Sequence, residues 1–159
     1  MIVLLFVVSI LIAFFCGGIW FARKPYELYR KAQAMSDKHL DLFLLMCKWF
    51  ELKQNNKSIT DYLKDNNYNN VAVYGVSYIG IALISELENS DVEVAYGIDT
   101  REIDIEIPVY KPENELPDTD IVIVTPVTYY EEIKGKISGR IDCPIVSLID
   151  VLEMTSTFY

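Results

Sequence analysis

The sequence is short of the residues that build metal centres, disulfide frameworks and nucleic-acid surfaces. It has one histidine, His39, and three cysteines without close spacing, Cys16, Cys47 and Cys143. This excludes a metal-binding box of the CxxC or HxxxH kind and a disulfide framework, so a reducing compartment is the simpler interpretation. Residues 68–159 are also poor in basic side chains, with five Lys and Arg against seventeen Asp and Glu. We expect no nucleic-acid partner, because phosphate binding needs clustered cations.

The first segment lacks charge altogether. Residues 2–22 contain no charged side chain, and at about 1.5 Å per residue a helix of this length spans about 31 Å, the thickness of a bilayer's hydrocarbon core. The alternative is a cleaved secretion signal, which has a basic start and a shorter apolar run. The cations that begin at Arg23 and Lys24 predict that the following chain stays inside the cell. We therefore expect residues 1–22 to be a retained single-pass anchor in a bacterial-type cell membrane, with the N-terminus outside and the domain cytoplasmic.

Residues 23–67 are predicted to be a helical connector with packing helices. A helix is expected over 37–53, with Ser36-Asp37 as its cap, and its apolar side chains extend most of the way round. Such a helix must be covered on two sides. The cover is either the rest of the domain or a partner: another copy of the chain, a polysaccharide-biosynthesis protein or the membrane surface. Ser58 and Asp61 have near capping-box spacing and predict a second, short helix.

Residues 68–159 alternate between strand and helix patterns. This alternation predicts an α/β fold: a Rossmann-like parallel sheet with flanking helices, preceded by the transmembrane helix and the connector. The apolar run at 121–124 is typical of a strand buried on both faces. Further strands are expected near 71–74, 92–99, 103–110 and 143–150, and helices near 78–87, 129–137 and 151–154.

A glycine turn between the first strand and its helix is the main candidate site. Dinucleotide-binding turns follow G-x-G-x-x-G, in which the glycines provide a tight turn, close approach of a pyrophosphate and close packing of the helix. Gly75 and Gly80 occupy the first and third positions, and Ser77 replaces the second glycine. Its Cβ narrows the space for phosphate, whereas its hydroxyl and the free N–H groups of the helix N-terminus favour phosphate.

Other residues are expected at the same edge of the sheet. Asp99 ends the second strand, 24 residues after Gly75, where an acid accepts hydrogen bonds from a ribose hydroxyl. Arg101 offers charge to a 2′-phosphate, although the nearby Asp99 opposes this. The alternative is that the turn serves packing alone. The candidate binding residues are Gly75, Val76, Ser77, Tyr78, Ile79, Gly80, Asp99, Thr125 and Pro126.

Four stretches carry a resemblance to a known family: "VAVYGVSYIG", "GID", "IPVYKPENELPDTDIVIVT" and "CPIVSLIDVL". Across residues 69–154 the chain resembles the small Rossmann-like nucleotide-sugar-binding domains of bacterial surface-polysaccharide biosynthesis, such as the N-terminal domain of sialic-acid and bacillosamine acyltransferases. The resemblance implies a nucleotide-sugar ligand. Those relatives have glycine where this chain has Ser77, and they carry catalysis in a further repeat domain.

Catalytic candidates are few. Tyr130 and Lys134 have the spacing of the acid–base pair of short-chain dehydrogenases, but they follow Gly75 by only 55 residues, much less than in that family. We interpret the pair as a chance match and name no catalytic residue. The sequence predicts a membrane-anchored module that binds a nucleotide sugar or NAD without chemistry, as a sensing or scaffolding subunit of surface-polysaccharide assembly. The alternatives are an NAD-dependent oxidoreductase or epimerase completed by a partner, and an interaction scaffold with an empty turn.

Overall fold

The computed structural model describes the backbone of residues 1–157 and, within that range, all side chains except those of 2–6 and 9–24. It divides the chain into two compact units, Met1–Leu42 and Phe43–Tyr159. Among the described residues, no helix combines the length and the hydropathy needed to cross a membrane. Nearly all side chains of the predicted anchor lie outside the described part.

The first helix, α1, runs from Ile2 to Gln54 and passes through Pro25. The predicted helix start at Ser36-Asp37 is therefore wrong. Residues 26–53 contain neither glycine nor proline and are rich in strong helix formers, so a serine and an aspartate are tolerated inside the helix. The compact unit that begins at Phe43 takes in the end of α1, whereas the sequence placed the domain boundary at residue 68.

Paired asparagines end the first two helices. Beyond α1, Asn56 adopts a positive φ of 53°, and the Lys57 N–H donates to the Leu52 carbonyl at 2.9 Å. Asn67, with φ of 60°, ends helix α2 (Ile59–Asp65) in the same way. Asparagine tolerates this left-handed conformation, in which the last carbonyls of a helix find donors.

The predicted capping box at the start of α2 is confirmed. The Ser58 side chain accepts a hydrogen bond from the Thr60 N–H at 3.2 Å, and the Asp61 carboxylate accepts from the Ser58 N–H at 2.9 Å. These two bonds satisfy backbone donors that a helix start leaves without partners.

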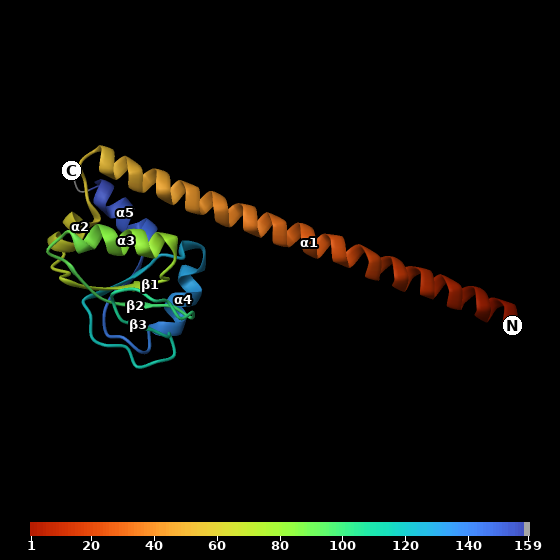
Figure 1. Cartoon of the computed structure of the whole chain (residues 1–159). Helices are drawn as coiled ribbons and strands as arrows, with labels where there is room; N and C mark the ends of the chain where they lie inside the picture. The colour runs from red at the N-terminus through yellow and green to blue at the C-terminus, as the bar shows by residue number, and fades with distance from the viewer. Residues whose placement is uncertain (158–159) are drawn as a thin grey trace. The chain divides into compact units, whose positions relative to one another are not determined.

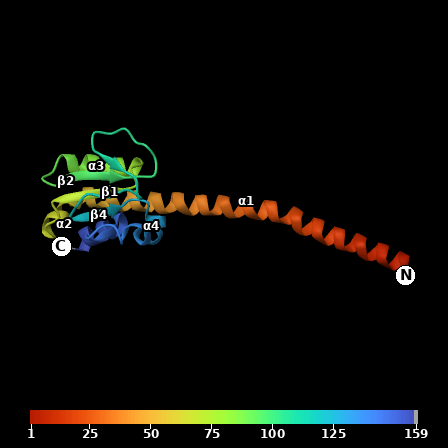
Figure 2. The same ribbon diagram turned by 90° about the horizontal axis from the view of Figure 1, so that it is seen from below.

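A five-stranded parallel sheet forms the centre of the larger unit, so the predicted α/β class is confirmed. The strands lie in the order β3-β2-β1-β4-β5, and Figure 2 shows β2, β1 and β4 side by side. The strands are β1 (Asn70–Tyr74), β2 (Glu93–Ile98), β3 (Val109–Tyr110), β4 (Ile121–Val124) and β5 (Ile145–Ser147). The remaining helices are α3 (Tyr78–Glu88), the 3-10 turn η1 (Val127–Tyr129), α4 (Tyr130–Ile137) and α5 (Leu148–Thr157).

One predicted strand is much shorter than expected. Of residues 103–110 only Val109 and Tyr110 pair with β2. The preceding isoleucines, Ile103, Ile105 and Ile107, are partly buried against the core without strand pairing. Their alternation reflects this packing, and Pro108 lacks the N–H that a longer ladder requires.

The sheet separates two apolar cores. On one face the end of α1 and helices α2, α3 and α5 cover the sheet (Figure 1). The buried side chains of these helices include Leu45, Trp49, Leu63, Leu83 and Leu152. On the other face α4 packs through Ile133 and Ile137. The end of α1 is thus an integral part of the core, and the rest of the domain covers one of its two apolar sides.

Candidate functional site

The glycine turn follows the central strand and leads directly into α3. Gly75 has φ of +89°, a conformation that side chains rarely tolerate. A Cβ at this position would lie 2.6 Å from the Pro126 ring and 2.8 Å from the Thr125 hydroxyl oxygen. Both the conformation and the space therefore require glycine at the first position of the turn.

Gly80 brings α3 close to the turn. A Cβ built on Gly80 would lie 2.2 Å from the carbonyl oxygen of Gly75, a distance that real side chains do not occupy. The third glycine therefore has the role that the pattern predicts, which is close packing of the helix on the strand and its turn.

Ser77 and Tyr78 form the outer part of the turn. Ser77 is the N-cap residue of α3, is exposed, and makes no side-chain capping bond. Tyr78 follows as the first residue of α3, and its side chain is 92% exposed. The turn thus presents a hydroxyl and an aromatic ring at a helix N-terminus, where free N–H groups favour anions.

Asp99, by contrast, is turned inward. It is only 6% exposed, and its Oδ2 accepts from the Val76 N–H at 3.0 Å and from Arg101 Nη2 at 3.1 Å. Its Oδ1 accepts from the Arg101 backbone N–H at 2.9 Å and from Arg101 Nε at 3.1 Å. Four hydrogen bonds fill the acceptor sites of a carboxylate. Asp99 therefore fastens the glycine turn to the end of β2, and a ribose hydroxyl would have to displace one of these donors.

The charge of Asp99 is stabilised by the same contacts. Burial alone raises the pKa of this carboxyl. The hydrogen bonds from the Arg101 side chain and backbone, the Arg101 charge and the Val76 N–H together outweigh burial and hold the pKa below its ordinary value. The Arg101 side chain is itself 62% exposed and also donates to the Val76 carbonyl at 3.3 Å. A positive group is thus fixed beside the turn.

Thr125 and Pro126 close the turn from the neighbouring strand. The Thr125 hydroxyl is buried and donates toward the Gly75 and Tyr74 carbonyl oxygens, at 2.7 and 3.1 Å. The Pro126 ring lies directly over Gly75. The structure therefore brings together all the residues predicted for this edge, but it uses Asp99 and Thr125 to hold the turn in shape.

Ser147 ends β5 beside β4, at this same edge of the sheet. Its hydroxyl is buried and has no hydrogen-bond partner within the described part of the chain. The sequence offers no signal for this feature, since a serine that precedes a helix ordinarily caps it.

Tyr130 and Lys134 are used structurally. The Tyr130 hydroxyl donates to the Ile145 carbonyl at 2.8 Å and so ties the start of α4 to β5. The Lys134 ammonium lies 5.3 Å from the centre of the Tyr130 ring, and a hydrogen bond with Tyr130 raises the pKa of Lys134. A tyrosine that acts as an acid–base has its hydroxyl free for substrate, whereas this hydroxyl is bonded to the backbone.

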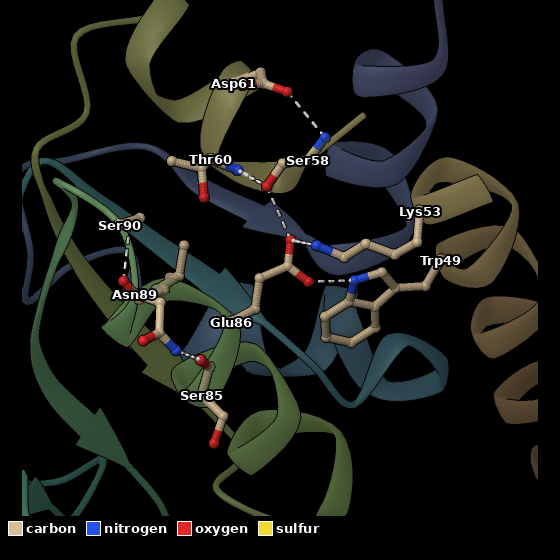
Figure 3. Close-up of polar contacts among 10 residues, drawn as sticks. Trp49, Lys53, Ser58, Thr60, Asp61, Ser85, Glu86, Asn89 and Ser90 are labelled. Carbon is tan, nitrogen blue, oxygen red and sulfur yellow. Dashed lines mark hydrogen bonds and ion pairs between the residues drawn. The ribbon is translucent and has the colours of Figure 1, made fainter. Parts of the chain in front are cut away.

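A second polar centre was missed by sequence reasoning (Figure 3). The carboxylate of Glu86 on α3, whose side chain is only 10% exposed, joins three groups from two other elements. It accepts from the Trp49 indole at 2.7 Å and from the Ser58 hydroxyl at 3.1 Å, and it forms an ion pair with Lys53 at 2.6 Å. The four residues lie in the sequence without any recognisable motif. Their arrangement holds α1, α2 and α3 together.

Comparison with known proteins adds no relative. No protein-family model, no curated protein and no solved structure matches this chain. Within the described residues, no group of three or more His, Cys, Asp or Glu side chains is placed to hold a metal ion.

Proposed function

We propose that the chain binds a nucleotide, either a nucleotide sugar or NAD, at the carboxyl edge of its sheet. The observation that carries the proposal is the place of the glycine turn. The strand order reverses at β1, because the chain passes from β1 to β2 and β3 on one side and then to β4 and β5 on the other. In open parallel sheets, ligands bind in the crevice at such a reversal. The Gly75 turn follows β1 and the Thr125-Pro126 segment follows β4, so both lie at this reversal.

Three groups support a phosphate-bearing ligand there. The N-terminus of α3 offers backbone N–H groups, and the Ser77 hydroxyl beside it makes no capping bond. Arg101 supplies a positive charge that Asp99 holds in place. Tyr78 presents an exposed ring on which a base or a sugar can stack. In this proposal Asp99 positions Arg101 and the turn. The ribose contact that the sequence predicted for Asp99 is made by other groups.

The proposed role is binding without chemistry. The groups that would transfer a proton are already bonded within the protein: Asp99 to Arg101 and Val76, and Tyr130 to the Ile145 carbonyl. Together with the resemblance to nucleotide-sugar-binding domains, this favours a sensing or scaffolding subunit of surface-polysaccharide assembly. The proposal locates that subunit at the cell membrane, with the domain in the cytoplasm. It is supported by the uncharged segment and its basic flank.

A second candidate function has its own support. The Pro126 ring and the Asp99 and Arg101 side chains fill the neighbourhood of Gly75. A turn kept closed in this way is also compatible with an interaction scaffold that binds no ligand.

Thermal unfolding of the detergent-solubilised full chain separates the two candidates. NAD and a panel of nucleoside-diphosphate sugars are the probes, and a ligand at 100 times its dissociation constant adds about 2.7 kcal/mol of stability. Ser77→Asp is expected to abolish this gain by repelling phosphate, while it still folds because aspartate is a good N-cap. Ser77→Gly restores the second glycine of the usual pattern and should strengthen binding.

Ser85→Asp, the same change at an exposed position two turns along α3, is the matched control and should bind like the parent. Equal binding by Ser77→Asp and the parent would contradict the proposed site. A parent that no probe stabilises would favour the scaffold.

A further inference from the structure

The end of α1 has an apolar stripe on the side that faces away from the sheet. Phe43 and Phe50 are 63% and 64% exposed, and the exposed Cys47 lies between them. Their spacing of four and then three residues places them on one line along the helix, as at the core positions of a coiled coil. Leu45, Trp49 and Leu52 occupy the opposite face and are buried in the core of the domain. The helix therefore has two apolar faces, and the described part of the chain covers only one of them.

The stripe borders a shallow groove between α1 and α3. The groove has a volume of about 230 Å³ and is lined by Met46, Trp49, Phe50, Lys53, Ala82 and Glu86. Its two ionic groups, Lys53 and Glu86, pair with each other, which leaves mainly apolar surface to contact a partner. A protruding row of side chains and a receiving groove thus lie next to each other on one surface. Such a surface is self-complementary, as an interface between two identical chains must be.

The area available agrees with a pair of chains. With about 200 Å² for a whole aromatic side chain, Phe43 and Phe50 together expose about 250 Å². Leu44, Met46 and Ala82 bring the apolar area to about 400 to 500 Å² per copy, within the range of the largest and often functional patch on a typical monomer. Two such patches with their polar margins reach the 1,200 Å² or so at which stable interfaces begin.

We propose that a second copy of this chain covers the stripe. The copies are related by a two-fold axis that brings the two Cys47 side chains together, with Phe43 and Phe50 on either side of them and each partner's phenylalanines against the groove. This pairing does not depend on the glycine turn or on any ligand.

Cys47 makes the pairing directly testable in the full chain. In a detergent-solubilised variant with Cys16→Ser and Cys143→Ser, mild oxidation should convert most of the protein into a disulfide-linked dimer through Cys47. Replacement of Cys47 by serine in the same background should give no disulfide-linked dimer. A Cys47 that forms no linked dimer, while a free-thiol assay shows it to be reactive, would overturn the proposed axis.

The mass of the complex, measured by light scattering without oxidation, gives the second test. Phe50→Asp should raise the dimer dissociation constant at least about 100-fold, because both copies lose a buried ring and gain a charge. The side chain is exposed in the single copy, so the circular dichroism spectrum should stay as in the parent, and the unfolding transition should change only by the stability that dimerisation adds. Tyr129→Asp, a matched change at a half-exposed aromatic residue on the α4 side of the sheet, should leave the mass unchanged. A monomeric parent, or a dimer that persists in Phe43→Asp and Phe50→Asp alike, would overturn the proposal and leave the stripe to lipid or to another protein.

Discussion

At the scale of single residues, the glycine turn depends on one carboxylate. Asp99 receives two hydrogen bonds on each oxygen, and three of its four donors belong to Arg101. The Thr125 hydroxyl also holds the turn, through the Gly75 and Tyr74 carbonyl oxygens, whereas Asp99 joins the turn to Arg101. Removal of the charge leaves the Val76 N–H and the guanidinium without their shared acceptor, which costs about 2 to 4 kcal/mol.

The acid dependence of stability follows from the same contacts. The pKa of Asp99 is lowered in the folded protein, while an aspartate in the unfolded chain titrates near 3.9. The stabilisation is therefore complete above about pH 4 and is lost as the pH falls through the folded pKa. We expect Asp99→Asn to be less stable than the parent at pH 7 and to show a smaller loss of stability between pH 5 and pH 3. Urea unfolding followed by circular dichroism measures both values, and parallel pH profiles would show that Asp99 has no such role.

The residues of the site could be predicted, but not the use to which the protein puts them. An acid at the end of the second strand is consistent with a ribose contact, and the sequence also places Arg101 two residues later. Whether the carboxylate of Asp99 binds a ribose or Arg101 depends on the backbone between Asp99 and Arg101 and on the burial of the site. Residue types alone reveal neither the backbone conformation nor the burial. Thr125 gives the same lesson, because a threonine after a buried strand can face a ligand or bond to its own sheet. Glu86 escaped notice because its partners come from two other helices, Trp49 and Lys53 from α1 and Ser58 from the start of α2.

At the scale of secondary structure, the approach of α3 to the turn is the tightest contact that the sequence pattern foretold. Gly80→Ala would place a methyl group against the backbone carbonyl of Gly75, which cannot move without disturbing β1. We expect a loss of about 1 to 3 kcal/mol or more in the free energy of unfolding. Gly135→Ala on α4 is the matched control, since the space around Gly135 is open. There the loss of a flexible glycine should add up to about 1 kcal/mol. Equal effects of the two substitutions in urea unfolding would contradict the packing role of Gly80.

Elements with strong periodicity were predicted well, whereas boundaries that depend on tertiary contacts were not. The β1-turn-α3-β2 unit, the buried strand β4 and the helix α4 lie where the pattern placed them. The expected strand over 103–110 is mostly irregular, because its isoleucines contribute to the core without a partner strand along their length. The order of the strands also could not be predicted from the sequence, because it depends on the side of β1 to which each crossover returns.

At the scale of the whole molecule, the folding unit is larger than the α/β pattern alone. Within the described part of the chain, six buried apolar side chains of this core come from residues before 68, namely Leu45, Trp49, Leu52, Ile59, Tyr62 and Leu63. At about 1.5 to 3 kcal/mol each, their burial contributes roughly as much as the total stability of a typical domain.

A truncation series tests this contribution. The fragment 43–159 should fold and unfold cooperatively, whereas 68–159 should not. Trp49 is the only tryptophan in the longer fragment, and its buried indole, bonded to Glu86, reports the transition by fluorescence. Circular dichroism provides the readout for the shorter fragment. A cooperative transition in 68–159 would show that the helices before β1 are accessory.

The strand order also has a consequence for how the chain folds as it is synthesised. The central strand β1 pairs with β4, and the partners Val71 and Ile121 are 50 residues apart. At roughly 5 to 20 residues per second, translation takes about 3 to 10 s to supply that distance. Non-local pairing of this kind makes folding slow. For several seconds, therefore, each nascent chain carries a hydrophobic central strand with an open edge, and this interval is when a chaperone would protect it from pairing with another nascent chain.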